Sequence, residues 1–215
     1  MAGKRKYELQ RRAERQEETR RRIAAATAEL HEEVGPANTT ISAVAARAGV
    51  ERVTVYRHFP DEADLLRACQ QHFLTAHPPP NPDPWLAISD PEQRLRSALQ
   101  ALYAYFRETE AMTANVLRDA SSMPVLAEVL GEMSRYVSSI REMLALGWPD
   151  SAPDAGMLIA AIGHAIDFET WRSLVRRQGL TDERAIEVMV KMVRSVSSVA
   201  ESGSPNAGNR PEGRR

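Results

Sequence analysis

The sequence has a single cysteine, no long apolar run and almost no pattern typical of β-strands. Because Cys69 is alone, an internal disulfide framework is excluded, and we expect the protein in a reducing cytoplasm. No apolar run reaches the roughly 18–20 residues that a membrane-spanning helix needs, so no membrane partner is expected. The first residues are basic but no apolar segment follows them, so they do not have the pattern of a secretory signal peptide.

Motifs of catalysis are also missing from the chain. It contains no nucleophile motif, no glycine-rich phosphate loop and no HExxH helix, and its histidines, cysteine and acids do not fall at metal-ligand spacing. We therefore expect no enzyme, no cofactor and no metal site. Hydrophobic residues make up 43% and charged residues 27%, as in an ordinary globular protein.

The charge is unevenly distributed, although the net charge is only −1. Residues 1–59 carry 12 Lys/Arg against 8 Asp/Glu, a net charge of +4, whereas residues 60–215 carry 16 against 21, a net charge of −5. A basic N-terminal part followed by an acidic remainder indicates that a polyanion would bind the N-terminal part only.

Apolar residues recur at helical spacing along nearly the whole chain, which predicts an all-α fold. The expected helices cover about 17–34, 40–47, 51–58, 62–76, 90–107, 109–120, 124–146, 153–178 and 182–201. Thr40 and Asp61 are expected N-caps, and Gly49 is expected to end the second helix. Six prolines between residues 78 and 91 interrupt the helical pattern. The expected parts are a basic arm (1–16), a helix-turn-helix domain (17–76), a helical ligand-binding and dimerisation domain (77–201) and a disordered tail (202–215).

The three short helices between residues 17 and 58, with a tight turn at Gly49, predict a helix-turn-helix. Six residues at core spacing would pack it: Ile41, Val44, Ala45, Val50, Val55 and Phe59. The others on the third helix would be exposed: Arg52, Val53, Thr54, Tyr56, Arg57 and His58. Arginine can bind guanine, valine can contact a thymine methyl group, and tyrosine and histidine can donate to phosphates. This pattern favours a DNA-recognition helix; an ordinary solvated helix is the alternative.

Residues 17–75, and above all TTISAVAARAGVERVTVYRHFPDEADLL, resemble the DNA-binding domain of the TetR family of bacterial transcriptional regulators. The motif residues are Thr39-Thr40-Ile41, Val44-Ala45, Ala48-Gly49-Val50 and Thr54-Val55-Tyr56-Arg57-His58-Phe59. The resemblance implies a homodimer whose two recognition helices bind successive major grooves of an inverted-repeat operator. It also implies that Arg52, Val53 and Thr54 contact bases, and that Thr40, Tyr56 and His58 contact phosphates.

Two positions depart from the family pattern. Val53 stands where glycine is frequent, and Glu62 replaces a lysine that would contact a phosphate at the start of the fourth helix. Losing that cation should weaken DNA binding unless other cations compensate. Six cations of the N-terminal arm are candidates, by phosphate or minor-groove contact: Lys4, Arg5, Lys6, Arg11, Arg12 and Arg15. A solvated arm without function is the alternative.

The resemblance further implies that a small-molecule cavity among the long helices is coupled to the fourth helix. Apolar, aromatic and polar residues of the second domain are candidate liners: Tyr103, Phe106, Met112, Val116, Leu126, Leu130, Met133, His164, Asp167, Phe168 and Trp171. For each apolar or aromatic residue, plain core packing is the alternative. His164 and Asp167 stand on an otherwise apolar helix, where they would anchor a ligand, bond each other or make a contact across a dimer.

The helices expected within 153–201 carry apolar residues on more than one face, which favours a four-helix dimer interface over a buried helix in a monomer. We expect a TetR-like repressor that a small apolar or amphipathic ligand releases from DNA. The alternative is a helical ligand-binding or interaction protein that has lost DNA binding.

Overall fold

A computed structural model describes residues 2–148 and 155–198, except for the side chains of residues 2–6, 155 and 198. Every regular element in these ranges is a helix, which confirms the all-α fold class. The chain forms two compact units. Unit 1 comprises Met1–Asn81 and Ala104–Ser138, and unit 2 comprises Pro82–Tyr103 and Ser139–Arg215.

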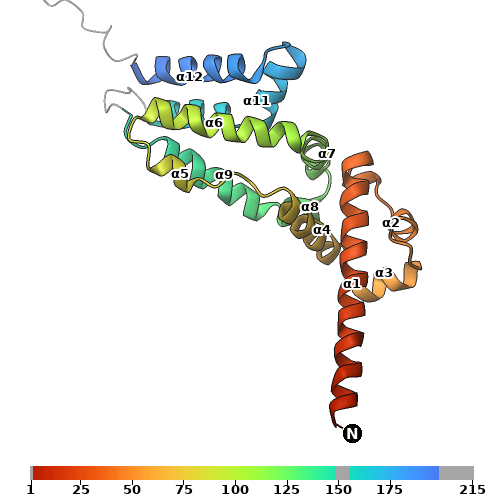
Figure 1. Ribbon diagram of the computed structural model, residues 1–215. Helices are drawn as coiled ribbons and strands as arrows, with labels where there is room; N and C mark the ends of the chain where they lie inside the picture. Colours follow the sequence, from red (N-terminus) through yellow and green to blue (C-terminus); the bar gives the residue numbers. More distant parts are fainter. Residues whose placement is uncertain (1, 149–154, 199–215) are drawn as a thin grey trace, which may run out of the picture. The chain divides into compact units, whose positions relative to one another are not determined.

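The N-terminal half of unit 1 is built around one long helix. α1 (Ala2–Val34) is followed by the 3₁₀ turn η1 (Pro36–Asn38), α2 (Ile41–Ala48), α3 (Arg52–His58) and α4 (Glu62–Ala76). Figure 1 shows α2 and α3 on the same side of α1. They enclose one hydrophobic core of Ile23, Ala26, Leu30, Val44, Ala45, Ala48, Val55, Phe59 and Leu65, with Ile41 and Val50 packed against it. Of the six residues expected to pack the helix-turn-helix, four are buried in this core, and Ile41 and Val50 are half-buried against it.

Local side-chain chemistry sets the ends of the short helices, as the sequence predicts. The Thr40 hydroxyl accepts a hydrogen bond from the Ala43 N–H (3.1 Å) and begins α2. The Asp61 carboxylate accepts one from the Asp64 N–H (2.7 Å) and begins α4. Gly49 ends α2 in the left-handed conformation, with φ of 64°, which glycine adopts without the steric cost of a Cβ atom.

The basic arm is helical. The residues expected as an arm continue into the helix expected from about residue 17, so that α1 is continuous over 33 residues. Residues 4–34 contain no proline or glycine, and charged side chains stabilise the exposed part, as in the Glu18–Arg21 ion pair (2.8 Å).

The rest of unit 1 contains α7 (Glu110–Ala120), α8 (Pro124–Val129), the end of α6 (Pro91–Glu108) and the first half of α9 (Gly131–Leu144). Leu126 and Val129 of α8 pack on Leu66 of α4. Met112 of α7 packs on Ala28 of α1 and on Cys69, which is buried in α4. Helices α7 and α8 therefore cover the side of α1 and α4 that the helix-turn-helix leaves open.

Unit 2 contains α5 (Asp83–Leu86), most of α6 (Pro91–Glu108), the second half of α9 (Gly131–Leu144), α10 (Ala155–Ala165), α11 (Phe168–Arg172), the π-helical turn η2 (Ser173–Arg177) and α12 (Asp182–Ser198). An ion pair between Arg96 and Glu187 (2.8 Å) joins α6 to α12. Two expected helices are divided: 124–146 at Leu130 and 153–178 at Ile166-Asp167. At the second break, Asp167 accepts a hydrogen bond from the Thr170 N–H (3.1 Å) and starts a new helix.

The proline-rich segment expected to separate two domains coincides with the change of unit at Asn81–Pro82, but unit 1 also includes residues 104–138. The expected tail, 202–215, lies outside the described residues. In the part of the chain that is described, no helix combines the length and apolar character needed to cross a bilayer.

Candidate nucleic-acid interface

Helix α3 presents most of its length to solvent. Val55 is buried, and Phe59 directly after the helix is buried with it, so these two residues fix the helix on the core. Arg52 and Arg57 are exposed, and so are the large apolar side chains of Val53 (65% exposed) and Tyr56 (50% exposed). Thr54 and His58, which the sequence analysis places among the exposed residues, are only half-buried because they lie at the edges of the exposed face.

Arg20 of α1 holds the end of α3. Its guanidinium donates a hydrogen bond to the backbone carbonyl of His58 (2.7 Å) and stacks over the Phe59 ring, 4.2 Å from the ring centre. Partial burial, with the nearby charges of Arg57 and Arg20, lowers the pKa of His58. His58 is therefore neutral in the free protein at neutral pH, and the charges that α3 offers a polyanion come from its two arginines.

The N-terminus of α2 offers a second candidate contact. Thr40 is exposed, and its oxygen accepts the Ala43 N–H, so its hydroxyl hydrogen is still able to donate to a phosphate. Arg47, at the other end of α2, forms ion pairs with two residues of α1, Glu29 (3.0 Å) and Glu33 (2.8 Å). Its charge is therefore compensated within the protein.

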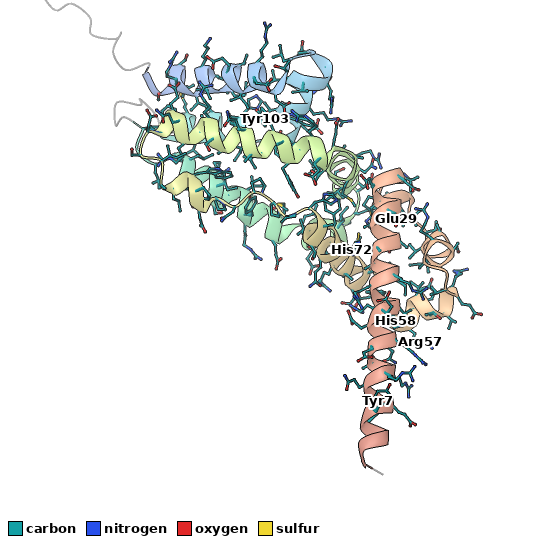
Figure 2. The ribbon with its side chains drawn as sticks, in the orientation of Figure 1. Tyr7, Glu29, Arg57, His58, His72 and Tyr103 are labelled. Carbon is teal, nitrogen blue, oxygen red and sulfur yellow. The ribbon has the colours of Figure 1, made fainter. Side chains whose placement is uncertain are left out.

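The N-terminal part of α1 carries further exposed cations. Arg11, Arg12 and Arg15 are exposed, and Arg11 lies over the Tyr7 ring at 5.8 Å. The backbone of Lys4, Arg5 and Lys6 is helical, whereas their side chains lie outside the described part of the structure. Figure 2 shows Tyr7 on the part of α1 that continues past Arg57 and His58. Glu62, the acidic departure from the family pattern, is exposed at the first residue of α4.

Two side chains of α7, Asn115 and Arg118, cap the end of α1, a role that the sequence did not reveal. The Asn115 amide donates to the carbonyls of His31 (3.0 Å) and Glu32 (2.8 Å). Arg118 donates to the carbonyl of Val34 (3.2 Å) and to the buried carboxylate of Asp119. These contacts satisfy carbonyls at the C-terminus of α1 that have no partner within the helix. No sequence signal reveals them, because they join residues more than 80 positions apart.

The eleven candidate ligand-binding residues are divided between the two units. Unit 1 holds Phe106, Met112, Val116, Leu126, Leu130 and Met133, and unit 2 holds Tyr103, His164, Asp167, Phe168 and Trp171. Within unit 1, Met112 and Val116 pack with Cys69 and Phe73, and Leu130 packs against the cluster around Leu66, to which Leu126 belongs. These four apolar residues therefore pack within unit 1, and Phe106 and Met133 are half-buried.

In unit 2, the aromatic candidates are buried and anchored. The Tyr103 hydroxyl donates to the carbonyl of Ala165 (2.9 Å), and burial raises its pKa. The Trp171 ring, fully buried and in contact with the buried Phe168, donates its N–H to Asp182 (3.2 Å). Figure 2 marks Tyr103 on α6.

His164 and Asp167 are both exposed and both contact Thr170. A ring nitrogen of His164 lies 3.0 Å from the Thr170 hydroxyl, and Asp167 caps α11 through the Thr170 N–H. Both side chains therefore have a local structural role at the break between α10 and α11. Across the described residues, no group of three or more histidine, cysteine or acidic side chains is placed to hold a metal ion.

Apolar side chains are exposed on α10 and α12. Met157 and Ile159 of α10 and Val188 of α12 are exposed, and Met192 and Val196 are half-buried. An exposed apolar surface on two helices of one unit is typical of a protein–protein interface.

The trihelical core, the tight turn at Gly49 and the exposed third helix define a helix-turn-helix DNA-binding domain of a transcriptional regulator. Residues 23–69 match the family model of bacterial regulatory proteins of the tetR family. The helix-turn-helix domain of this chain therefore matches the DNA-binding domain of that family. No curated protein sequence matches the chain.

Solved structures of TetR regulators share the fold at low sequence identity. A TetR transcription regulator from Haloarcula marismortui is 20% identical, with a TM-score of 0.56, over 84% of this chain and 97% of that one. A TetR-like transcriptional regulator from Rhodococcus sp. RHA1 is 17% identical, with a TM-score of 0.58, over 84% and 96% of the two chains. The TetR family regulator PfmR from Thermus thermophilus is 20% identical, with a TM-score of 0.54, over 82% and 94%.

Proposed function

We propose that the protein is a sequence-specific repressor of transcription that binds an inverted-repeat operator as a homodimer. The exposed surface of α3 carries this proposal. Val55 and Phe59 anchor the helix in the core, while Arg52, Val53 and Tyr56 extend into solvent, although large apolar side chains are normally buried. A helix that exposes arginines beside apolar side chains suits the major groove, which offers both guanine acceptors and thymine methyl groups.

In this proposal the residues have distinct roles. Arg52, Val53 and Thr54 contact base edges, and Thr40, Tyr56 and His58 contact phosphates, with Arg57 adding a cation beside them. Lys4, Arg5 and Lys6, with the other cations of the arm, contact the backbone or the minor groove outside the recognition helix. Phosphate contacts fix the position of the protein, and base contacts select the sequence.

The dimer is formed through α10 and α12, within about residues 153–201. The support is the exposed Met157, Ile159 and Val188, which would be covered by the same surface of a second copy. A symmetric dimer carries two α3 helices, one for each half of an inverted repeat.

A small apolar or amphipathic effector releases the operator by binding among the helices that follow α4. The candidate contacts are Tyr103, Phe106, Met112, Val116, Leu130, Met133, His164, Asp167, Phe168 and Trp171. The effector acts only if it binds the DNA-free form more tightly than the operator-bound form.

A second candidate function is supported by Glu62. This carboxylate is exposed at the first residue of α4, where a cation would contact a phosphate, and it would repel DNA. A helical ligand-binding or interaction protein that has lost DNA binding would keep this residue without cost.

Selection of bound fragments from random double-stranded DNA distinguishes the two functions. A repressor enriches an inverted repeat, and Arg52→Ala then lowers affinity by about 1–3 kcal/mol and relaxes the preference at one base pair of each half-site. Arg135→Ala, which removes an equally charged and exposed residue from α9, is the control and keeps the wild-type affinity. Recovery of no common sequence from the selection would contradict the proposal and favour the second function.

A further inference from the structure

A cavity of about 280 Å³ lies within unit 1, among the elements of the DNA-binding domain. Its walls come from α1, η1, α2, α3 and the first turn of α4, and Met123 closes one side. Most of the lining is apolar, with Val44, Phe59, Leu65 and Leu66 contributing buried side chains. The volume is close to the lower limit of ordinary ligand pockets, about 300 Å³, and exceeds the roughly 150 Å³ of an apolar cavity that holds benzene.

Two buried polar side chains of α1 face this cavity. Thr27 and His31 are one helical turn apart, and His31 is only 4% exposed. Nδ1 of His31 lies 3.4 Å from Sγ of Cys69, and Cys69 does not line the cavity. Because Nδ1 is used in this contact, Nε2 is the ring nitrogen that remains to bond a ligand in the cavity. The Thr27 hydroxyl donates to the carbonyl of Ile23 (2.8 Å), so its oxygen is still able to accept.

The charges around the cavity select against an ion. Burial lowers the pKa of His31 to about 4, so the ring is neutral at pH 7 and can donate or accept one hydrogen bond. No lysine or arginine lines the cavity, whereas the carboxylates of Asp61 and Glu62 do. These carboxylates repel an anion, and the apolar walls make the desolvation of any charged group costly.

We propose that this cavity binds a small uncharged ligand of one ring with one hydroxyl group, of the phenol type, and that the bound ligand weakens DNA binding. The hydroxyl group pairs with His31 and Thr27, and the ring fills the apolar part. The effect on DNA rests on the proposed function, because the walls include Tyr56 and Thr39, next to the candidate phosphate contact Thr40. A ligand that shifts these side chains favours the DNA-free form.

Binding is tested with phenol itself on the full-length chain labelled with ¹⁵N-histidine. A saturable shift of the His31 resonances, with Kd of about 1 mM or tighter, supports the proposal. Benzene, which lacks the hydroxyl group, binds about fivefold more weakly, and benzoate does not bind. Absence of saturable phenol binding, or binding of benzoate as tight as that of phenol, overturns it.

Matched variants locate the site. Ile41→Trp places a large ring on the wall from a half-buried position and lowers phenol affinity at least about tenfold. Ser42→Trp, at the next and exposed residue of α2, leaves it unchanged. Thr27→Val keeps the side-chain volume and removes the hydroxyl acceptor. The affinity for phenol should fall about fivefold, while the affinity for benzene is retained. Unchanged phenol binding in both Ile41→Trp and Thr27→Val places the ligand elsewhere and overturns the proposal.

The effect on DNA is measured separately, by anisotropy of a selected fragment with and without saturating phenol. A several-fold loss of affinity in wild-type protein and in Ser42→Trp, but not in Ile41→Trp, supports the coupling. If the protein binds both phenol and DNA but its affinity for DNA is the same with and without phenol, the proposed effect of the ligand on DNA binding is wrong. A chain that binds phenol but no DNA sequence contradicts the proposed function and leaves the site itself supported.

Discussion

The Asp119 carboxylate accepts a hydrogen bond from the backbone N–H of Ala37 at 3.0 Å, although 82 residues separate them. The bond joins the end of α7 to η1, the turn that leads from α1 into the helix-turn-helix. Arg118 holds the same carboxylate (2.7 Å) and lowers its pKa, so Asp119 stays charged although it is buried. Helix α7 thereby fixes where the chain turns before α2.

Two glycines allow this contact to be tested. Gly49 (φ 64°, ψ 41°) has the left-handed helical conformation, which another residue adopts at a cost of about 1 kcal/mol, whereas Gly35 (φ 89°, ψ 160°) has one that is essentially restricted to glycine. A Cβ atom at Gly35 would also lie 2.1 Å from the Arg118 guanidinium and 2.6 Å from the Asp119 carboxylate, whereas one at Gly49 meets nothing within 4 Å. In urea unfolding, Gly35→Ala is expected to cost at least about 1 kcal/mol more than Gly49→Ala. Equal losses would mean that α7 does not constrain the turn.

Because His31 is buried, we expect the free energy of unfolding of the protein to depend on pH. Its pKa is about 6.5 when unfolded and about 4 in the folded protein, because burial opposes the charged ring. Between these values only the unfolded chain binds the proton, so the free energy of unfolding falls as the pH falls from 6.5 to 4, by up to about 3 kcal/mol. Denaturation at stepped pH should show that slope reduced in His31→Gln. His72→Gln, at an exposed histidine of α4, controls for the loss of a histidine as such; the same slope in His31→Gln and wild type would contradict the assignment.

Deleting residues 1–16 is expected to make DNA binding less dependent on salt. The deletion removes six cations, and each phosphate that is no longer neutralised reduces the slope of log K against log[salt] by about 0.9. A full-length variant in which Lys4, Arg5, Lys6, Arg11, Arg12 and Arg15 are changed to glutamine is the control for helix length. It should reproduce the deletion; a wild-type slope in both proteins would show that the arm does not contact DNA.

Val188→Glu is expected to dissociate the dimer. The substitution would bury an unpaired carboxylate in the interface proposed for α12, which is strongly unfavourable. Val137→Glu is matched to it, since Val137 and Val188 are both 42% exposed and Val137 lies on α9. Sedimentation should show a folded monomer for Val188→Glu and a dimer for Val137→Glu, with DNA binding lost only in the monomer. A dimeric, folded Val188→Glu protein would place the interface elsewhere.

Local features of this fold could be predicted from the sequence, because a cap or a tight turn depends on neighbouring residues. Thr40, Gly49 and Asp61 each set a helix end where the pattern predicts it, and the spacing of Val44, Val55 and Phe59 identifies the core of the helix-turn-helix. The break at Asp167 was missed because helical periodicity continues across it, although Asp167 is a good N-cap.

Long-range contacts could not be predicted in this way. Asn115, Arg118 and Asp119 have the pattern of an ordinary polar helix surface, and only the folded chain brings them to the end of α1. The cavity beside His31 likewise depends on how five elements pack together. A periodic pattern identifies which residues are buried but not which of them leave a space between them.

The continuity of α1 provides a place to attach a spectroscopic reporter. At about 1.5 Å per residue the helix is about 50 Å long, and Tyr7 stands about 20 Å along it from Arg20, whose guanidinium holds the end of α3. A fluorophore or spin label in place of the exposed Tyr7 disturbs no residue of the hydrophobic core and removes only the contact with Arg11. Because the helix acts as a lever, a small rotation of the DNA-binding domain becomes a larger displacement of the label. Distances between two such labels in a dimer would follow the angle between the recognition helices without any modification of α3.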